Sequence, residues 1–458
     1  MTDYEAFLER KAQMDGRAGF EPLWVPDFLF PFQQMLTDWS IRQGRGALFV
    51  DCGGGKGPMA LVWAQNVYKY TGKPVLLLTR LGVTEQMVTE GAKFGVDVEI
   101  SRDGKTPAPV TVTNYERLEH FDSDKFGGVV CDESSALKAY DGVRRAMVTE
   151  FMRTRPYRLL ATATPSPNDH TELGTSSEAL GYLGHMDMLA RFFTNKDKTS
   201  KARGGRWRSR AGEEWRFKGH AEVPFWQWVS SWARAMRKPS DLGFEDDGFI
   251  LPPLEMRHHM VDARRAKEGT LFDVPAIGLD EEREATRRTI AERCEKAAEL
   301  LTDADPGIAW CHLNDEGDLL TKLIPGAVQV AGSDPVEEKE ENLSAFGRGE
   351  IRVLVTKPRI ASWGLNYQNC HRMTYMVDHS FEAMYQAIRR CWRFGQTQPV
   401  TVDVISTTGG ERMLANLERK AAQADAMFSS LTAHMRDAQS IQRAETYSKK
   451  AEVPSWVC

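Results

Sequence analysis

The chain has 458 residues, more than a single hydrophobic core supports, so we expect two or three domains. Its 41% apolar and 27% charged residues are typical of a soluble globular protein, and the formal net charge of −5 argues against uniform coating of a polyanion. Seven scattered cysteines without a C-x-x-C pair favour a reducing cytosol over a disulfide framework or zinc site, and no apolar run approaches the ~18 residues of a membrane span.

Short apolar runs closed by polar or glycine-rich turns recur through the first 185 residues. Runs of this kind are typical of parallel strands that are buried on both faces of a sheet. The strands expected there are residues 47–51, 75–79, 109–113, 128–132 and 157–163. The alternation returns with expected strands at residues 308–312, 327–331, 351–356, 373–378 and 400–405. The pattern predicts two α/β domains.

The composition changes between the two blocks of strands. We expect an N-terminal domain at residues 1–185, a basic and aromatic insert with a linker at 186–280, and a C-terminal domain at 281–458. Residues 411–450 are charged and predict one or two helices in the tail of the last domain.

A glycine-rich turn follows the first expected strand, in FVDCGGGKGPMALVWA at residues 49–64. Gly53, Gly54 and Gly55 let backbone N–H groups approach phosphate oxygens, and Lys56 can reach the β- and γ-phosphates. Gly57 stands where loops of the G-K-S/T kind carry a hydroxyl for magnesium. Taken alone, the segment also fits a tight turn with a solvated lysine.

Two adjacent acids, Asp132 and Glu133, close the expected strand at 128–132. Acids at the carboxyl edge of a strand suit one carboxylate that holds magnesium and another that orients an attacking water. The alternative for the pair in isolation is a polar turn. Their position downstream of a lysine loop favours the first interpretation.

The order of these motifs resembles superfamily 2 helicases. DESS (132–135) looks like their D-E-x-x box and TATPSPND (162–169) like their third motif, while QAIRRCWRFGQ (386–396) is similar to the sixth motif of the Swi/Snf-type branch. PFQ, TNYERL, WCHLNDE, VAGSD and SWGLNYQ resemble flanking motifs. The residues of these motifs are most similar to those of compact helicases encoded by phages and prophages. This resemblance implies that the protein is located in the cytoplasm of a bacterial or phage-infected bacterial cell.

The resemblance implies two RecA-like parallel-sheet domains in tandem, with ATP and Mg²⁺ as cofactors and DNA as partner. It assigns the phosphates to Lys56, the magnesium to Asp132 and the catalytic water to Glu133. Arg390 and Arg393 would act as arginine fingers, and their spacing of three predicts one helical face. The further residues implied to bind nucleotide are Gln33 (adenine), Gly364 and Gln386, and those implied to bind nucleic acid are Asn114 and Lys357.

The insert contains a strongly basic stretch. Residues 191–220 hold ten Lys/Arg against three Asp/Glu, a local charge of +7. A basic stretch with interleaved aromatics suits phosphate contacts and base stacking, with a solvated surface as the alternative. The expected nucleic-acid contacts are Arg203, Arg206, Arg208 and Arg210. Directly after it, Phe225, Trp228, Val229 and Trp232 follow one helical face, which indicates core packing.

These features predict an ATP-dependent DNA translocase or helicase that acts as a monomer on duplex or branched DNA. The alternative is a nucleotide-gated DNA clamp that scarcely hydrolyses ATP because of Gly57, and a third, weaker possibility is an RNA helicase. We expect nucleotide binding to survive Gly57 with a high magnesium requirement, which a sterically compatible threonine would lower. Two other departures from the family are Gly54, where a larger apolar residue is common, and Arg80, where proline is expected.

Overall fold

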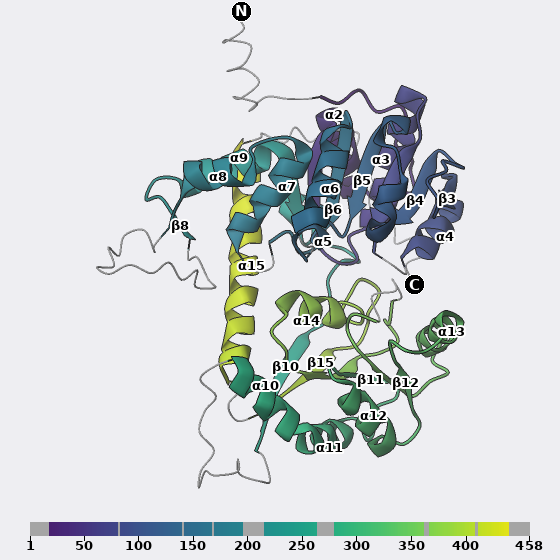
Figure 1. Cartoon of the computed structure of the whole chain (residues 1–458), viewed down its shortest axis with the longest axis vertical. Helices are drawn as coiled ribbons and strands as arrows, with labels where there is room; N and C mark the ends of the chain where they lie inside the picture. The colour runs from purple at the N-terminus through teal and green to yellow at the C-terminus, as the bar shows by residue number, and fades with distance from the viewer. Residues whose placement is uncertain are drawn as a thin grey trace, which may run out of the picture. The chain divides into compact units, whose positions relative to one another are not determined.

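The computed structural model of the chain describes residues 18–80, 83–139, 142–166, 169–195, 215–262, 279–360, 366–407 and 411–438. The chain divides into two compact units, Met1–Asp246 with Ala424–Glu452, and Asp247–Gln423 with Val453–Cys458. Each unit is built around its own parallel sheet (Figure 1). Within the described ranges, no helix is both long and apolar enough to cross a membrane.

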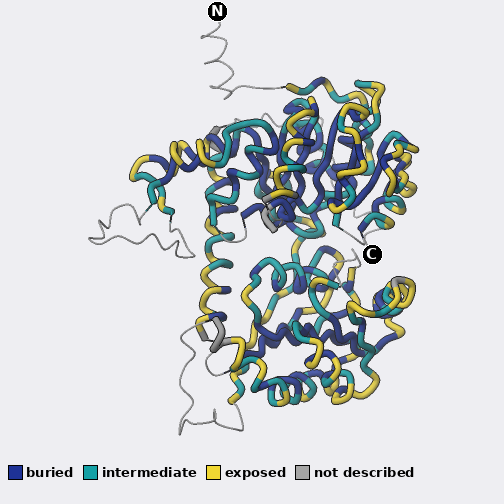
Figure 2. The backbone as a smooth tube through the Cα atoms, viewed as in Figure 1, coloured by how far each residue is buried: buried dark blue, intermediate teal, exposed yellow. Residues whose placement is uncertain are grey.

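The first unit contains a sheet in the order β3-β4-β2-β5-β6-β1-β9. All of its neighbouring strands pair in parallel, and four of them are buried at every residue. The strands are β1 (Arg45–Val50), β2 (Val75–Thr79), β3 (Val98–Ile100), β4 (Val110–Asn114), β5 (Gly128–Asp132), β6 (Tyr157–Thr162) and β9 (Ala233–Met236). Continuous apolar runs produce such strands because helices cover both faces of a parallel sheet. The burial of the sheet is visible in Figure 2.

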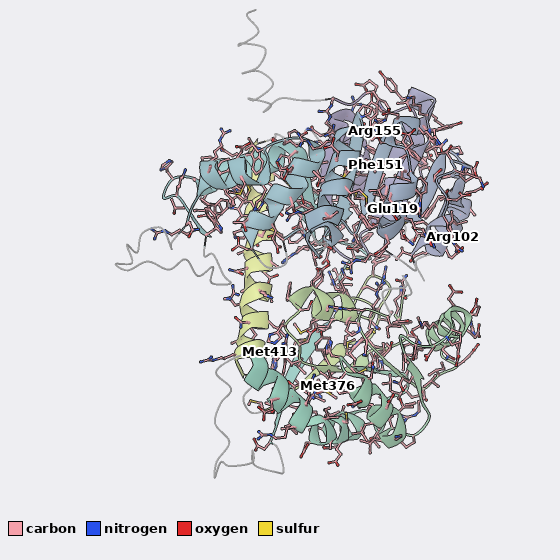
Figure 3. The ribbon with its side chains drawn as sticks, in the orientation of Figure 1. Arg102, Glu119, Phe151, Arg155, Met376 and Met413 are labelled. Carbon is pink, nitrogen blue, oxygen red and sulfur yellow. The ribbon has the colours of Figure 1, made fainter. Side chains whose placement is uncertain are left out.

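The helices of the first unit connect these strands. Glycines in the left-handed region end three of them, because Gly72 (φ 68°) follows α3, Gly95 (φ 69°) follows α4 and Gly181 (φ 86°) follows α7. The α-helices are α2 (Pro31–Gln43), α3 (Lys56–Thr71), α4 (Thr84–Phe94), α5 (Ala136–Ala139), α6 (Gly142–Arg153), α7 (Leu173–Leu180), α8 (His185–Phe192) and α9 (Glu222–Trp232). Figure 3 labels Phe151 on α6 and Arg155 just after it, and the Arg155 guanidinium donates to the Phe126 carbonyl at 3.1 Å.

The aromatic part of the insert belongs to the core of the first unit. Phe225, Trp228, Val229 and Trp232 of α9 are all buried, which confirms the predicted helical face. After α9 the chain enters β9, which pairs with β1 at the edge of the sheet. Strands β7 (Phe193–Asn195) and β8 (Trp215–Phe217), which precede α9 in the chain, pair antiparallel. The basic residues Arg203, Arg206, Arg208 and Arg210 lie outside the described residues.

The second unit contains a parallel sheet in the order β10-β15-β14-β11-β13-β12. Its strands are β10 (Leu254–Val261), β11 (Gly307–Trp310), β12 (Ala327–Val330), β13 (Val353–Thr356), β14 (Arg372–Met376) and β15 (Val400–Thr407). Its helices are α10 (Leu279–Arg288), α11 (Ile290–Leu300), α12 (Asn314–Leu323), α13 (Val336–Gly347), α14 (Phe381–Ile388) and the first part of α15 (Glu411–Ala438). The predicted fold class, two α/β domains that each contain a parallel sheet, is confirmed.

The boundaries between the units differ from the expected positions at 185 and 280. The insert is divided, because β9 extends the first sheet whereas β10 pairs with β15 in the second. The end of α15 also belongs to the first unit, where Met435 lies with its sulfur 3.2 Å from the Ala235 amide of β9. An edge strand exposes unpaired backbone groups, so covering β9 with a helix protects it. The change in composition used to place these boundaries does not indicate which sheet a segment joins.

A buried ion pair connects α11 to the start of α12 in the second unit. Arg293 Nη1 lies 2.6 Å from Glu316 Oε1, and both side chains are at most 2% exposed. The other carboxylate oxygen accepts hydrogen bonds from the amides of His312 (2.9 Å) and Leu313 (3.0 Å). Burial opposes ionisation of Glu316, but Arg293 and these amides outweigh it and lower the pKa of the carboxyl group.

We predict that Glu316→Ala destabilises the second unit by about 3–5 kcal/mol, because Arg293 is left as a buried charge without its partner. Urea unfolding followed by tryptophan fluorescence measures this change. The matched control is Glu338→Ala, an exposed acid on α13, which should change stability by less than about 0.5 kcal/mol. Equal effects of the two substitutions would contradict a structural role for the pair.

Candidate functional site

The glycine-rich loop joins β1 to α3 at the carboxyl end of the first sheet. Gly53 and Gly55 have φ angles of 84° and 86°, in the left-handed region that glycine adopts without strain. Helix α3 begins directly at Lys56, so the unpaired N–H groups of its first turn lie next to the loop. The Lys56 ammonium donates to the Val50 carbonyl at 3.0 Å, which holds it at the end of β1. This is the arrangement expected of a phosphate-binding loop.

The Gln33 side chain of α2 is hydrogen-bonded to this loop. Its Nε2 donates to the Gly54 carbonyl at 3.1 Å, and its Oε1 accepts from the Phe30 amide at 3.0 Å. A Cβ on Gly55 would overlap Gln33 Nε2, so this position requires glycine for space as well as for its φ angle. Gln33 is 2% exposed and braces the loop, a role that the sequence did not indicate. Adenine recognition by this residue stays a prediction.

The absence of a larger side chain at Gly54 has a packing explanation. A Cβ at this position would overlap Val50 Cγ1 and lie 3.1 Å from Met236 Cε. Met236 is the last residue of β9, the strand that the insert adds beside β1. Glycine at position 54 therefore leaves room for the side chains of Val50 and Met236.

Asp132 and Glu133 lie where β5 ends, beside the ends of β2 and β6. Thr79, the last residue of β2, donates to Asp132 Oδ2 at 3.4 Å. Thr162, the last residue of β6, donates to Glu133 Oε2 at 3.3 Å. Glu133 has a φ of 50°, an uncommon conformation for a non-glycine residue that is typical of functional sites. The sheet thus brings the T-A-T segment into contact with the acid pair.

Burial and the neighbouring acids raise the pKa of Asp132. Burial, and after it the charge of Glu133, raise the pKa of Asp132 to about 7. Lys56 lowers this pKa and Glu90 raises it, both to a smaller extent. Two neighbouring carboxylates thus oppose the ionisation of Asp132, and Lys56 is the cation that favours it. Bound cations are often the largest local charges in sites of this kind.

Gly57 lies against a residue that the sequence analysis did not single out. A Cβ on Gly57 would overlap Oε2 of Glu90, with the carboxyl carbon 3.2 Å away and Oε1 3.6 Å away. Glu90 belongs to α4, which packs against α3. The expectation that position 57 accepts a threonine therefore requires the Glu90 carboxylate, the end of a flexible side chain, to move. Glu90 was missed because an acid on an amphipathic helix normally faces solvent, and its sequence position gives no indication of where α4 docks.

The donors at this edge suit magnesium. Mg²⁺ prefers oxygen ligands and is commonly held by one or two carboxylates together with the phosphates of a substrate. The Asp132 carboxylate beside a phosphate-binding loop matches that donor set. The candidate cofactors ATP and Mg²⁺ are thus compatible with the residues present.

The arginine motif lies in the second unit and departs from the expected geometry. Helix α14 ends at Ile388, so Arg390 and Arg393 lie in the turns beyond it and the predicted common helical face is wrong. The turn is held because the Tyr367 amide donates to the Arg390 carbonyl at 2.8 Å. Gln396, buried, donates from Nε2 to the Cys370 carbonyl at 2.9 Å. The Q-A end of the motif thus lies in α14, and the G-Q end holds the turn that follows the helix. In this turn Arg393 donates to Asn366 Oδ1.

The remaining predicted residues lie at several places. Lys357 follows β13 and lines a pocket of about 720 Å³ in the second unit, where its Nζ lies 2.5 Å from Asn314 Oδ1. Asn114 is buried at the carboxyl end of β4 in the first unit. Gln386 of α14 donates to Glu382 at 3.5 Å. Gly364 lies outside the described residues. Arg80, which replaces the expected proline, donates to Ser135 Oγ at 3.4 Å beside the acid box.

Of the comparisons with known proteins, only the one with solved structures found a match. Its sequence matches no protein-family model. It matches no curated protein either. Among solved structures, it is similar to the SWI2/SNF2 ATPase core of Sulfolobus solfataricus in complex with dsDNA, with 16% sequence identity and a TM-score of 0.42. The match covers 93% of this chain and 99% of that one.

We predict that Asp132→Asn stabilises the metal-free protein at pH 8 and does so less at pH 5. A buried carboxyl group with a raised pKa stabilises the fold in its protonated form, and this contribution is lost as the pH rises toward about 7. The gain from asparagine should therefore grow by up to about 2.7 kcal/mol between pH 5 and pH 8, since each pKa unit corresponds to 1.36 kcal/mol. Chemical denaturation in EDTA at the two pH values measures it.

The control is Asp97→Asn, an exposed acid before β3. Its effect should be the same at both pH values within about 0.5 kcal/mol. A gain from Asp132→Asn that does not depend on pH would show that Asp132 is ionised throughout this range.

Proposed function

We propose that this chain is an ATP-dependent DNA translocase or helicase of the superfamily 2 kind, which couples ATP hydrolysis to movement on DNA or to its remodelling. One observation carries the proposal. Lys56, Asp132, Glu133 and Thr162 come from three separate motifs and meet at the carboxyl edge of one parallel sheet, with Thr162 bonded to Glu133. Ligands of open α/β sheets bind at this edge.

Each residue of this edge has a chemical task in the proposed reaction. The loop amides and Lys56 would bind the β- and γ-phosphates, and Asp132 would hold Mg²⁺, which neutralises charge on the phosphates when it is bound. Glu133 would hold the attacking water, and the hydrogen bond from Thr162 fixes the direction of its carboxylate. We assign Arg390 and Arg393 to the charge that develops on the γ-phosphate.

DNA is the proposed partner because of the insert. The basic stretch is attached to the first unit at both ends by the β7–β8 pair, with Asn195 opposite Trp215 and Phe193 opposite Phe217. Phe217 stacks on Phe193 with ring centroids 4.6 Å apart, and it also contacts Phe225 of the buried α9. A basic stretch that joins these two strands would bind the phosphate backbone without regard to sequence.

Gly57 supports a second candidate, a nucleotide-gated DNA clamp with little hydrolysis. Without a hydroxyl at this position the loop itself supplies no side-chain ligand for magnesium. Nucleotide binding is common to both candidates, whereas turnover is not. Turnover therefore distinguishes the translocase from the clamp.

We predict that duplex or branched DNA stimulates ATP turnover, and that Glu133→Gln lowers the rate by about 10² or more because a carboxamide is a poor base. Nucleotide affinity should change little, since the carboxamide oxygen still accepts from Thr162. Steady-state ATPase assays and titration with a fluorescent nucleotide measure the two quantities. The control is Glu119→Gln, an exposed acid labelled in Figure 3, which should leave both unchanged. Absence of turnover with every DNA at millimolar magnesium would favour the clamp.

We also predict that replacing Arg203, Arg206, Arg208 and Arg210 with alanine weakens DNA binding and reduces its salt dependence. The slope of log affinity against log salt should fall by about 0.9 for each lost phosphate contact with duplex. Fluorescence anisotropy over a salt series measures the slope. The control replaces four exposed lysines elsewhere, Lys73, Lys105, Lys125 and Lys322. An equal change in slope for both sets would remove the special role of the insert.

A further inference from the structure

The side chain of Glu90, in the middle of α4, fills the space next to the first turn of α3. In a loop of the G-K-S/T kind, the side chain of the residue after the lysine starts at that place. Here the residue is Gly57, and a Cβ built on it would lie 2.2 Å from Glu90 Oε2. An oxygen from another helix thus lies within 2.2 Å of the point where a side chain of residue 57 would begin.

The Glu90 carboxylate is held in a defined orientation. Gln86, one turn earlier on α4, donates from Nε2 to Glu90 Oε1 at 2.8 Å. Oε2, the oxygen that faces Gly57, is shielded from solvent. The carboxylate is thus oriented by α4 and faces the first turn of α3.

The charge on Glu90 lies beside the loop that would bind the phosphates. Its Oε2 faces Gly57, the second residue of α3, directly after Lys56. A divalent cation held by the phosphates next to this loop would be attracted to the carboxylate. Carboxylate oxygen is also a ligand that Mg²⁺ accepts readily.

We propose that Glu90 of α4 replaces the missing hydroxyl of the phosphate loop as a ligand of the nucleotide-bound Mg²⁺. This inference rests on the proposed nucleotide site. Glycine at 57 is then a requirement of the arrangement, because any side chain there would displace the carboxylate. The expected high magnesium requirement does not follow from Gly57 alone, since the ligand is supplied from α4.

The experiment measures binding of a non-hydrolysable ATP analogue to the full-length protein by calorimetry, in EDTA and over a magnesium series. Glu90→Gln should raise the half-saturating magnesium concentration by about tenfold or more, the scale on which metal sites respond to loss of a supporting group. In EDTA its affinity should stay the same or increase, because a negative charge near the phosphates has been removed. Mn²⁺ bound to the protein–analogue complex, counted by electron paramagnetic resonance, provides a second readout.

Two further variants distinguish a role of Glu90 as a metal ligand from a general effect of its negative charge. Glu85→Gln removes an exposed carboxylate from the same helix and should leave the magnesium titration unchanged. The exchange variant Gly57→Ser with Glu90→Ala carries a hydroxyl in the loop and no acid on α4. It should recover the magnesium dependence to within about threefold of the unaltered protein, whereas Glu90→Ala alone should not.

The outcomes are distinct. If the unaltered protein binds no nucleotide in EDTA or magnesium, the proposed function fails. If it binds nucleotide and Glu90→Gln changes the half-saturating magnesium concentration by less than twofold, the assignment of Glu90 is overturned. The assignment is also overturned if the exchange variant is folded by circular dichroism and requires as much magnesium as Glu90→Ala. Recovery in the exchange variant supports it even where Glu90→Gln is poorly folded.

Discussion

Parallel pairing of β1, β2, β5 and β6 is the constraint on which the candidate site depends. In a parallel sheet every strand ends at the same edge, so residues that are distant along the chain become neighbours there. Thr79, Asp132 and Thr162 are each the last residue of a strand, and the phosphate loop begins where β1 ends. The register is fixed by continuous burial of the apolar residues, as in β5, where Gly128 pairs with Tyr157 and Asp132 with Ala161. The hydrophobic core therefore positions the polar edge.

Electrostatics at that edge favour a bound cation. Burial and neighbouring carboxylates raise the pKa of Asp132, and Lys56 offsets only part of this effect. An ionised Asp132 is thus more stable with a cation beside it than without one. Thr79 and Thr162 each donate a hydroxyl to one acid, so the carboxylates have fixed orientations before any ligand arrives. Preorganised groups of this kind lower the cost of binding and of reaction.

Much of the fold was predictable because buried parallel strands have a strong sequence pattern. The residues expected as strands at 75–79 and 128–132 coincide with β2 and β5. The short β3, and the edge strands β9 and β10, were not predicted. β9 reads ARAM and β10 reads LEMRHHMV, where polar and charged residues interrupt the apolar pattern that was used to find strands.

The site was predictable where a motif is local and unpredictable where tertiary docking decides. Lys56, Asp132 and Glu133 follow from the sequence because each chemical group lies next to the strand that positions it. The orientation of Gln33 toward Gly54 depends on how α2 packs. The turn that contains Arg390 depends on a backbone bond to Tyr367, a residue far from it in sequence. The periodicity of the sequence predicts a helix that continues through Arg390, because the pattern contains no information about the hydrogen bond to Tyr367.

A metal ligand on α4 would have a consequence that a hydroxyl within the loop would not. A hydroxyl at position 57 would be placed by the same backbone that binds the phosphates, and so it would be present whenever the loop is formed. Glu90 reaches Gly57 only while α4 is packed against α3. Helix α4 also packs on β4, whose last residue, Asn114, is one of the proposed nucleic-acid contacts. A displacement of α4 would then alter metal binding and the surroundings of Asn114 together. Coupling between nucleotide and DNA in this protein would need no contact between the two ligands, only a helix whose position both of them favour.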